Sequence, residues 1–224
     1  ANIFGGHRLG LSATPNRTDK NEGIFLAHLG PVFFSDIEQD LSPLIKIVDT
    51  DVFVSEAAEK SFIDKGRNIN LNLIRSWLAE NKDRNLLIVD TIRDCLKEGR
   101  TCYVLSHTVN HVEELAKHFP GASVIHGGTK SEDRLPLLNK GNIVFATIAI
   151  GKEAYNRKEL DTLFLVTPFA AHAHSAIAFE QSVGRIQRAC PNKKDPVVYI
   201  FRDSTIGMCK GLVASLVKHA RKKN

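Results

Sequence analysis

The stretch TCYVLSHTVNHVEELAKHF, residues 101–119, decides the fold class. Its apolar run 102–105 is followed by a polar turn and then by apolar residues that recur at the spacing of one helical face. Further apolar runs occur at 123–127, 142–150, 162–168 and 196–201, most of them followed by a helical pattern. Strands that alternate with helices, and that are apolar almost throughout, are typical of a parallel sheet buried on both faces. We therefore expect an α/β fold with three layers, in which helices cover both faces of a mostly parallel sheet.

The rest of the chain adds elements at both ends of this repeat. The patterns predict a short helix over 20–29, a half-exposed strand over 43–54, helices over 68–81 and 85–99, and a closing helix over 205–222. Prolines at positions 31 and 43 interrupt the chain. We therefore place a domain boundary between about residues 30 and 42.

The composition is that of a globular protein, with 43% hydrophobic and 25% charged residues among 224. No apolar run is long enough to span a bilayer, and the N-terminus has neither the charged start nor the apolar centre of a signal peptide. We therefore expect an intracellular protein with no membrane partner. Nuclear, cytoplasmic and viral replication compartments all stay open.

The net charge of +5 is weak evidence for a nucleic-acid partner. The terminal run Lys218, Arg221, Lys222 and Lys223 supplies four of these charges, and no acidic residue follows Asp203. One net positive charge remains for the rest of the chain. A basic terminal run is also typical of a solvated helix end.

The cysteines and histidines do not predict a metal site. The four cysteines are scattered without a C-x-x-C pair, so neither a zinc site nor a disulfide framework is expected. His172 and His174 are two residues apart, with no cysteine beside them and no acidic residue before Glu180. We therefore expect no bound metal from these residues.

The segment QSVGRIQR, residues 181–188, carries the strongest chemical pattern. On a helix, Gln181, Arg185 and Arg188 project from one face, because they are spaced by four and three residues. Gly184 costs the helix about 1 kcal/mol relative to alanine, which indicates that a ligand approaches the backbone there. Guanidinium groups match phosphate oxygens, so this face suits a polyanion. The alternative is an arginine stripe that simply faces solvent.

Polar and small residues follow the predicted strands. In doubly wound sheets, ligands bind beyond the carboxyl ends of the strands, so these residues are candidates for a binding site. They are Ser106, His107 and Thr108, then His126, Gly127, Gly128 and Thr129, then Ala146 and Thr147, and finally Thr167 and Pro168.

Taken in order, these segments resemble the motif series of superfamily 2 helicases and translocases. The matching segments are SATP at 12–15, SHT at 106–108, HGGT at 126–129, ATIAIGKEAYN at 146–156 and QSVGRIQR at 181–188. The surroundings of the first and last segments are similar to the branch that contains the XPB repair translocase, phage recombination helicases and the transcript-release helicases of large DNA viruses. Five matches in the right order are more specific than any one of them.

The resemblance implies a RecA-like fold and a protein in which two such domains have different roles. Residues 1–40 would be the end of a first RecA-like domain and a linker, and residues 41–224 would be the second, C-terminal one. No G-x-x-x-x-G-K-[ST] phosphate loop and no D-E-x-[DH] box occurs in these residues. ATP and Mg²⁺ would therefore be bound mainly by the first domain, so we expect no ATP hydrolysis by this chain alone.

The resemblance also implies roles for individual residues. Arg185 and Arg188 would be arginine fingers, Gln181 would orient the attacking water or sense the phosphate, and Gly184 would admit the nucleotide. Ser12 and Thr14 would couple the two domains. Contacts to a DNA or RNA backbone, independent of sequence, would come from Ser106, His107, Gly127, Gly128, Thr129 and Thr147.

One segment departs from the motif series. Relatives often carry E-G-x-D where this chain has Glu153-Ala154-Tyr155-Asn156. Glu153 matches, whereas Asn156 keeps hydrogen bonding and loses the charge of an aspartate. Either this change puts the strength of ATP coupling in doubt, or the role of the aspartate has moved to Glu153 or Asp161.

The main alternative to a motor domain is a catalytically silent RecA-like module that binds nucleic acid or a protein. The altered segment at 153–156 supports it, and the two arginines on one face argue against it. A small-molecule enzyme would need a glycine-rich turn after the first strand of the repeat, and none follows residues 101–106. The residues do not separate DNA from RNA, strand opening from duplex translocation, or viral transcription from repair.

Overall fold

The computed structural model describes residues 10, 22–32, 41–151, 157–169 and 173–221, and it divides the chain into two compact units, Ala1–Gln39 and Asp40–Asn224. In the first unit, helix α1 spans Glu22–Leu29, as the sequence predicts. The helix ends where Gly30, at a φ of +88°, donates its N–H to the Leu26 carbonyl at 2.8 Å. A glycine adopts this left-handed conformation without a steric penalty, so it is a suitable residue for the end of the helix.

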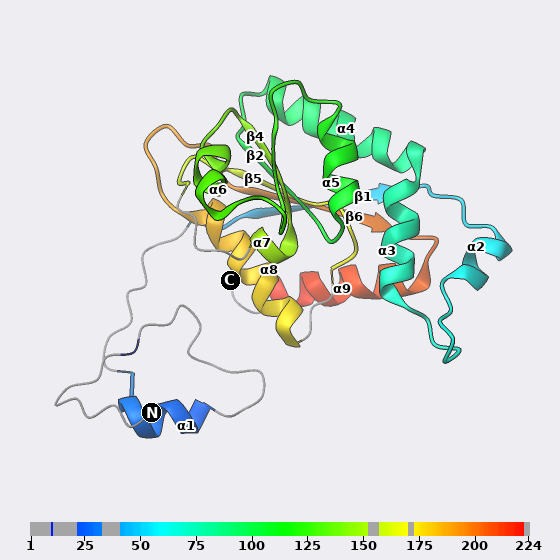
Figure 1. Ribbon diagram of the computed structural model, residues 1–224, viewed down its shortest axis with the longest axis horizontal. Coiled ribbons are helices and arrows are strands. Elements are labelled where there is room, and N and C mark those ends of the chain that lie inside the picture. The colour runs from blue at the N-terminus through cyan, green and yellow to red at the C-terminus, as the bar shows by residue number, and fades with distance from the viewer. Residues whose placement is uncertain (1–9, 11–21, 33–40, 152–156, 170–172, 222–224) are drawn as a thin grey trace. The chain divides into compact units, whose positions relative to one another are not determined.

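The second unit is built on a six-stranded parallel sheet with the order β1-β6-β5-β2-β4-β3 (Figure 1). All five strand pairs are parallel. The strands are β1 (Leu44–Thr50), β2 (Cys102–Ser106), β3 (Ser123–Ile125), β4 (Ile143–Thr147), β5 (Thr162–Leu165) and β6 (Val197–Asp203). The predicted α/β class is confirmed, and all carboxyl ends lie along one edge of the sheet.

Helices cover both faces of the sheet, because side chains alternate along each buried strand. Cys102 and Val104 pack against α4 (Lys82–Lys97) and α5 (Val109–Ala116). Tyr103 and Leu105 pack on the other face in a cluster that includes residues of α8 (Ala173–Gln187) and α9 (Gly207–Arg221). Figure 1 shows α4 and α5 on one side of the strands and α8 and α9 on the other. The result is the expected arrangement of three layers.

A third, smaller core lies beyond the carboxyl end of β1. It joins Val52, Phe62, Ile74 and Leu78 to Ile206 at the start of α9. Its elements are α2 (Glu56–Ser61) and α3 (Leu71–Glu80). Helix α2 is too short for its periodicity to be recognised in the sequence. Its start is fixed by the Ser55 hydroxyl, which accepts the Ala58 N–H at 3.3 Å.

One predicted strand is wrong in length. The apolar run 142–150 predicts a single strand, but β4 ends at Thr147 and Ile148–Gly151 forms the helical turn α7. The remaining helix of the repeat is α6, Ser131–Leu138. A Cβ atom at Gly151 would lie 3.0 Å from Leu105 Cδ2, so the turn packs closely on β2. A continuous apolar run does not distinguish a buried strand from a buried helical turn.

Candidate functional site at the carboxyl edge of the sheet

The connections that follow β2 and β5 run towards opposite ends of the sheet, and the loops after these two neighbouring strands contact each other. β2 lies between β4 and β5, and its own connection leads towards β4, whereas that of β5 leads towards β6. At this switch point the His107 N–H donates to Thr167 Oγ1 at 3.2 Å, and the ring Nδ1 lies 2.7 Å from the same oxygen. Ligands of open α/β sheets bind at such a point. The structure therefore brings the SHT segment and the residues after β5 into one place.

The loop after β5 connects this point to α8. The Phe169 ring packs on His107, with ring centroids 5.4 Å apart, and on Phe179 of α8, at 6.3 Å. Phe179 is two residues before Gln181 in the same helix. A contact chain therefore leads from His107 to α8, which contains Arg185 and ends one residue before Arg188.

Two buried arginines hold the same loop from the opposite side. Arg84 of α4 donates to the Val166 carbonyl, and Arg75 of α3 donates to the Pro168 carbonyl, both at 2.9 Å. Burial lowers the pKa of Arg75 to about 10, so the guanidinium is still charged at neutral pH. Four successive residues, 166–169, are thus each held by a specific contact.

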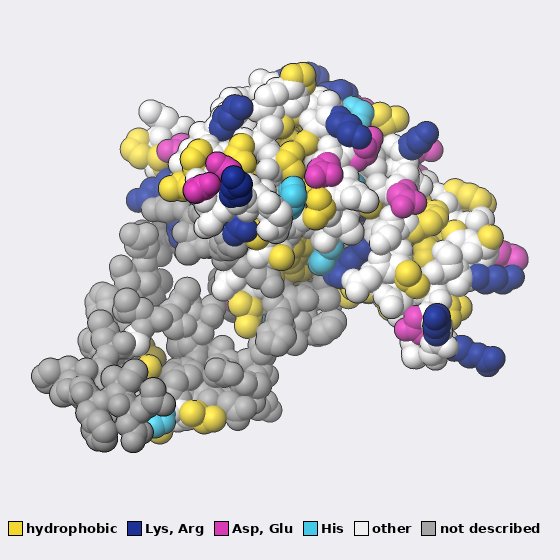
Figure 2. Space-filling view, viewed as in Figure 1, with side chains coloured by type: hydrophobic (Ala, Val, Ile, Leu, Met, Phe, Trp, Pro, Cys, Tyr) yellow, Lys and Arg dark blue, Asp and Glu magenta, His cyan; other side chains and the backbone are white. Residues whose placement is uncertain are grey.

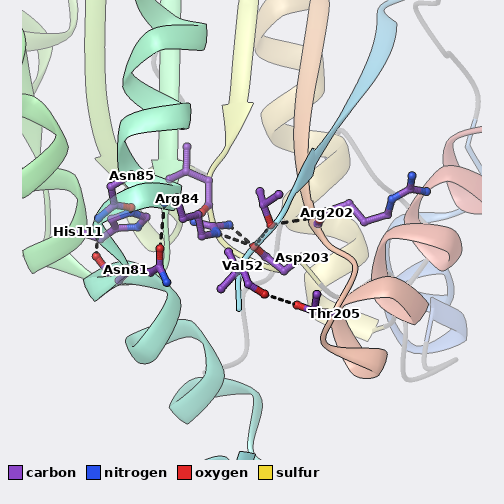
Figure 3. A network of polar contacts seen from close by, with 11 residues as sticks. Val52, Asn81, Arg84, Asn85, His111, Arg202, Asp203 and Thr205 are labelled. Atoms are coloured by element: carbon purple, nitrogen blue, oxygen red, sulfur yellow. Dashed lines mark hydrogen bonds and ion pairs between the residues drawn. The ribbon is translucent and has the colours of Figure 1, made fainter. Parts of the chain in front are cut away.

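A directed hydrogen-bond chain fixes the start of α5 (Figure 3). The Asn85 amide nitrogen donates to the Ala79 carbonyl at 2.8 Å, so its oxygen accepts from His111 Nε2 at 3.0 Å. His111 Nδ1 must then accept from the Ser106 hydroxyl at 3.0 Å, and Ser106 accepts the Thr108 N–H at 3.4 Å. Burial, with a smaller contribution from Arg84, lowers the pKa of His111 to about 3, so the ring is neutral.

This arrangement gives Ser106 a different position from the expected phosphate contact. Its side chain is fully buried and its hydroxyl already has His111 and the Thr108 amide as partners. Thr147, its neighbour on β4, is also buried, with 6% exposure. His107, which directly follows β2 at the same edge of the sheet, is half-buried.

The HGGT segment forms a turn closed by its own side chains. Thr129 Oγ1 accepts the His126 N–H at 3.0 Å, and the His126 ring accepts the Gly128 N–H at 3.1 Å. A Cβ atom at Gly127 would meet no atom within 4 Å, so this residue has open space beside its backbone. Gly127 is the better placed of the two glycines for contact with a ligand.

Gln181 and Arg185 lie four residues apart in helix α8, and Arg188 follows directly after Gln187, the last residue of that helix. Burial and then the charge of Arg188 lower the pKa of Arg185. The two guanidinium groups are therefore within electrostatic reach of each other. A Cβ atom at Gly184 would meet nothing within 4 Å, which leaves room beside the backbone next to Arg185.

Several predicted residues cannot be placed. Ser12, Thr14, Glu153 and Asn156 lie outside the described residues. His172 and the side chain of His174 lie outside them as well. Within the described residues, no group of three or more His, Cys, Asp or Glu side chains could hold a metal ion. In the same part of the chain, no helix is both long and apolar enough to cross a membrane.

Nothing in the sequence pattern indicates the two buried arginines. An arginine on an amphipathic helix normally predicts a solvated face, and only the partner carbonyls show that Arg75 and Arg84 point inward. Thr167 was a candidate from its place after a strand, but its pairing with His107 depends on the strand order.

No protein-family model and no curated protein matches the chain. Among solved structures, the crystal structure of T4 UvsW is similar over 81% of this chain, with a TM-score of 0.57 and 13% sequence identity. The chain has a RecA-like fold. The C-terminal part of the Fun30 ATPase domain matches 55% of the chain, with a TM-score of 0.43 and 14% identity. The matches span 39% of the UvsW chain and 44% of the Fun30 chain.

Proposed function

We propose that this chain is the second RecA-like domain of an ATP-dependent nucleic-acid helicase or translocase. The observation that carries the proposal is the proximity of Arg185, in α8, to Arg188, one residue beyond the end of that helix, together with the open backbone at Gly184. Two like charges held together raise each other's free energy, and a bound polyanion removes that cost. The γ-phosphate of ATP is the polyanion that the motif resemblance implies.

In this proposal the two guanidinium groups stabilise the charge that develops on the transferred phosphoryl group. Gln181, one turn before Arg185, orients the attacking water. ATP and Mg²⁺ are bound mainly by a preceding RecA-like domain, to which residues 1–40 belong in part. The phosphate loop and acidic box are absent from this sequence, so the chain alone is proposed to be inactive.

The carboxyl edge of the sheet is proposed to hold the backbone of DNA or RNA without regard to sequence. His107, Gly127, Gly128, Thr129 and Thr147 are the proposed contacts. Ser106 is proposed to act indirectly, because its buried hydroxyl orients His111 and the start of α5. Such contacts suit a motor that steps along any sequence.

The loop 166–169 supports coupling between these two regions. His107, at the carboxyl edge of the sheet, contacts Thr167 and Phe169, and Phe169 contacts Phe179 in α8. A shift of the loop would therefore move both the edge and α8. Closure of the two domains around ATP is proposed to use this connection.

The test uses the protein in which this chain follows its first RecA-like domain. Arg185→Ala and Arg188→Ala should each lower nucleic-acid-stimulated ATP hydrolysis by about 10³-fold or more, while binding of a labelled single strand stays within about twofold. Arg93→Ala, an exposed arginine on α4, is the matched control and should hydrolyse ATP normally.

Normal hydrolysis by both variants would overturn the finger assignment. A wild-type protein that binds nucleic acid but hydrolyses no ATP would instead favour a catalytically silent binding module. Strand displacement and triplex displacement, measured side by side on the same protein, would separate a helicase from a duplex translocase.

A further inference from the structure

A pocket of about 590 Å³ lies between α3, α4 and α5. This volume is within the range of roughly 300–1,000 Å³ that single small ligands fill. Its lining comprises Ser76, Ala79 and Glu80, then Lys82, Asn85 and Leu86, then Thr108, Asn110, His111, Glu114 and His118. Thr108 follows the end of β2 by two residues, so the pocket opens near the carboxyl edge proposed to bind nucleic acid.

The back of this α3–α5 pocket is rigid. His111 is buried and neutral, and both of its ring nitrogens are engaged, by Ser106 and by Asn85. Asn85 is itself fixed by the Ala79 carbonyl. A ligand therefore meets a preorganised wall, which lowers the cost of binding.

One polar atom of the lining lacks a partner. Among the described residues, the Thr108 hydroxyl oxygen is buried and makes no hydrogen bond. Buried polar groups are normally paired, so an unpaired hydroxyl on a pocket wall indicates a ligand or a water molecule. Thr108 also precedes α5 without capping it through its side chain.

The rim of the pocket carries both hydrogen-bond donors and hydrogen-bond acceptors. Lys82 and Asn110 can donate, whereas Glu80 can only accept when ionised. The Glu114 carboxylate is paired with Lys117 at 2.5 Å. Figure 2 shows basic, acidic and histidine side chains interspersed over the region that Figure 1 labels α4 and α5. This mixture disfavours a phosphate, which two carboxylates would repel.

We propose that the α3–α5 pocket takes one unstacked nucleobase of a strand bound along the carboxyl edge. The proposal rests on the nucleic-acid role proposed above. A base is neutral and planar, carries donors and acceptors along one edge, and can pack its face on the exposed Leu86 side chain. Backbone contacts at the edge hold the strand, and the pocket adds a contact to a base.

The Glu80 carboxylate on the pocket lining predicts which base the pocket prefers. Cytosine presents an exocyclic amine, which a glutamate accepts well, whereas thymine and uracil present a carbonyl oxygen at the same place. We expect cytosine to bind better than thymine or uracil. A site that contacts only the backbone would not make this distinction.

The test measures binding of this chain to fluorescein-labelled oligodeoxycytidine and oligothymidine of equal length by fluorescence anisotropy. The wild-type chain should bind the cytosine strand about three- to tenfold more tightly, the range expected for one hydrogen bond. Oligocytidine and oligouridine, measured in the same way, decide whether DNA or RNA is the source of the base.

Two variants separate the pocket from the rest of the surface. Glu80→Gln should reduce the preference to about twofold or less, because its amide can also donate to thymine. Ser76→Trp should fill the pocket, abolish the preference and leave backbone binding in place. Ser215→Trp, on the exposed side of α9, is the matched control and should keep the wild-type preference. Thermal unfolding checks that each variant folds.

The two proposals fail in different ways. Equal binding of the cytosine and thymine strands by the wild type, unchanged by Ser76→Trp, would overturn the pocket proposal and leave nucleic-acid binding standing. The absence of any anisotropy change with all four oligonucleotides would overturn the nucleic-acid role, and the pocket proposal with it.

Discussion

Arg84 and Asp203 form a completely buried ion pair, with Arg84 Nε 2.7 Å from Asp203 Oδ1 and neither side chain exposed. Asp203 also accepts from the Thr50 hydroxyl at 2.7 Å, and Arg84 also donates to the Val166 carbonyl (Figure 3). The pair thereby joins α4 to the carboxyl ends of β1, β5 and β6. Through Val166, the pair also supports the loop whose next residue, Thr167, contacts His107.

Breaking this pair from one side should destabilise the domain strongly. Arg84→Met leaves the Asp203 carboxylate buried without its counter-charge, which costs about 3–5 kcal/mol in comparable sites. The double variant Arg84→Met, Asp203→Leu removes both charges and should recover much of that loss. Urea unfolding of this chain measures both.

The exposed pair between Arg202 and Asp49 provides the control. It is bidentate and short, at 2.5 and 2.6 Å, but it lies in solvent. Arg202→Met should shift the unfolding midpoint far less than Arg84→Met. Similar losses for the two variants would show that burial does not set the strength of the Arg84 contact.

His111 should make stability depend on pH. Its pKa of about 3 lies below the ordinary value near 6.5, so the unfolded chain binds the proton first as the pH falls. The contribution is complete above about pH 6.5 and is lost progressively towards pH 3. Between pH 7 and pH 5 the loss amounts to about 2 kcal/mol.

The measurement is urea unfolding at both pH values, compared with His111→Gln. The variant does not titrate at this position, so its stability should fall by about 2 kcal/mol less than that of the wild type between the two pH values. Equal losses in the two proteins would mean that the His111 ring is not held neutral.

The periodic parts of this fold could be predicted from the sequence. Runs such as 102–105 and 162–165 became central strands, because continuous apolar residues need burial on both faces. Continuity alone did not set the end of β4, since Ile148 and Ile150 are as buried in the turn α7 as they would be in a strand.

The contacts of the candidate site depended on tertiary structure. The helix that contains Gln181 and Arg185 could be predicted from its periodicity, but its end at Gln187, one residue before Arg188, could not. The pairing of His107 with Thr167 requires β2 and β5 to be neighbours, which local patterns do not determine. Ser106 shows that a motif can also mislead. The motif indicated a ligand contact, but the Ser106 hydroxyl is buried inside the fold.

The His107 contact makes a further prediction. Thr167→Val keeps the shape of the side chain and removes the oxygen that accepts the His107 N–H. Loss of this partner should cost about 1–3 kcal/mol and should speed hydrogen exchange at the His107 amide. Thr91→Val, on the exposed face of α4, is the control and should change neither by a comparable amount. Unchanged exchange at His107 would contradict the role of the Thr167 oxygen.

A substitution at Gly184 can distinguish a structural role of this glycine from a ligand-binding role. A Cβ atom there meets nothing within 4 Å, so Gly184→Ala should fold and should stabilise α8 by up to about 1 kcal/mol. Gly211, in α9, has the same open surroundings, and Gly211→Ala should give a similar gain. Thermal unfolding of this chain measures both changes.

The two alanine variants should differ in function. If a nucleotide approaches the α8 backbone between Gln181 and Arg185, the added methyl group at position 184 occupies the space of the ligand. ATP hydrolysis by the protein with both RecA-like domains should then fall for Gly184→Ala, although the domain is more stable, and stay normal for Gly211→Ala. Stabilisation with full activity in both variants would show that no ligand lies against Gly184, and the finger assignment would lose its support from this helix.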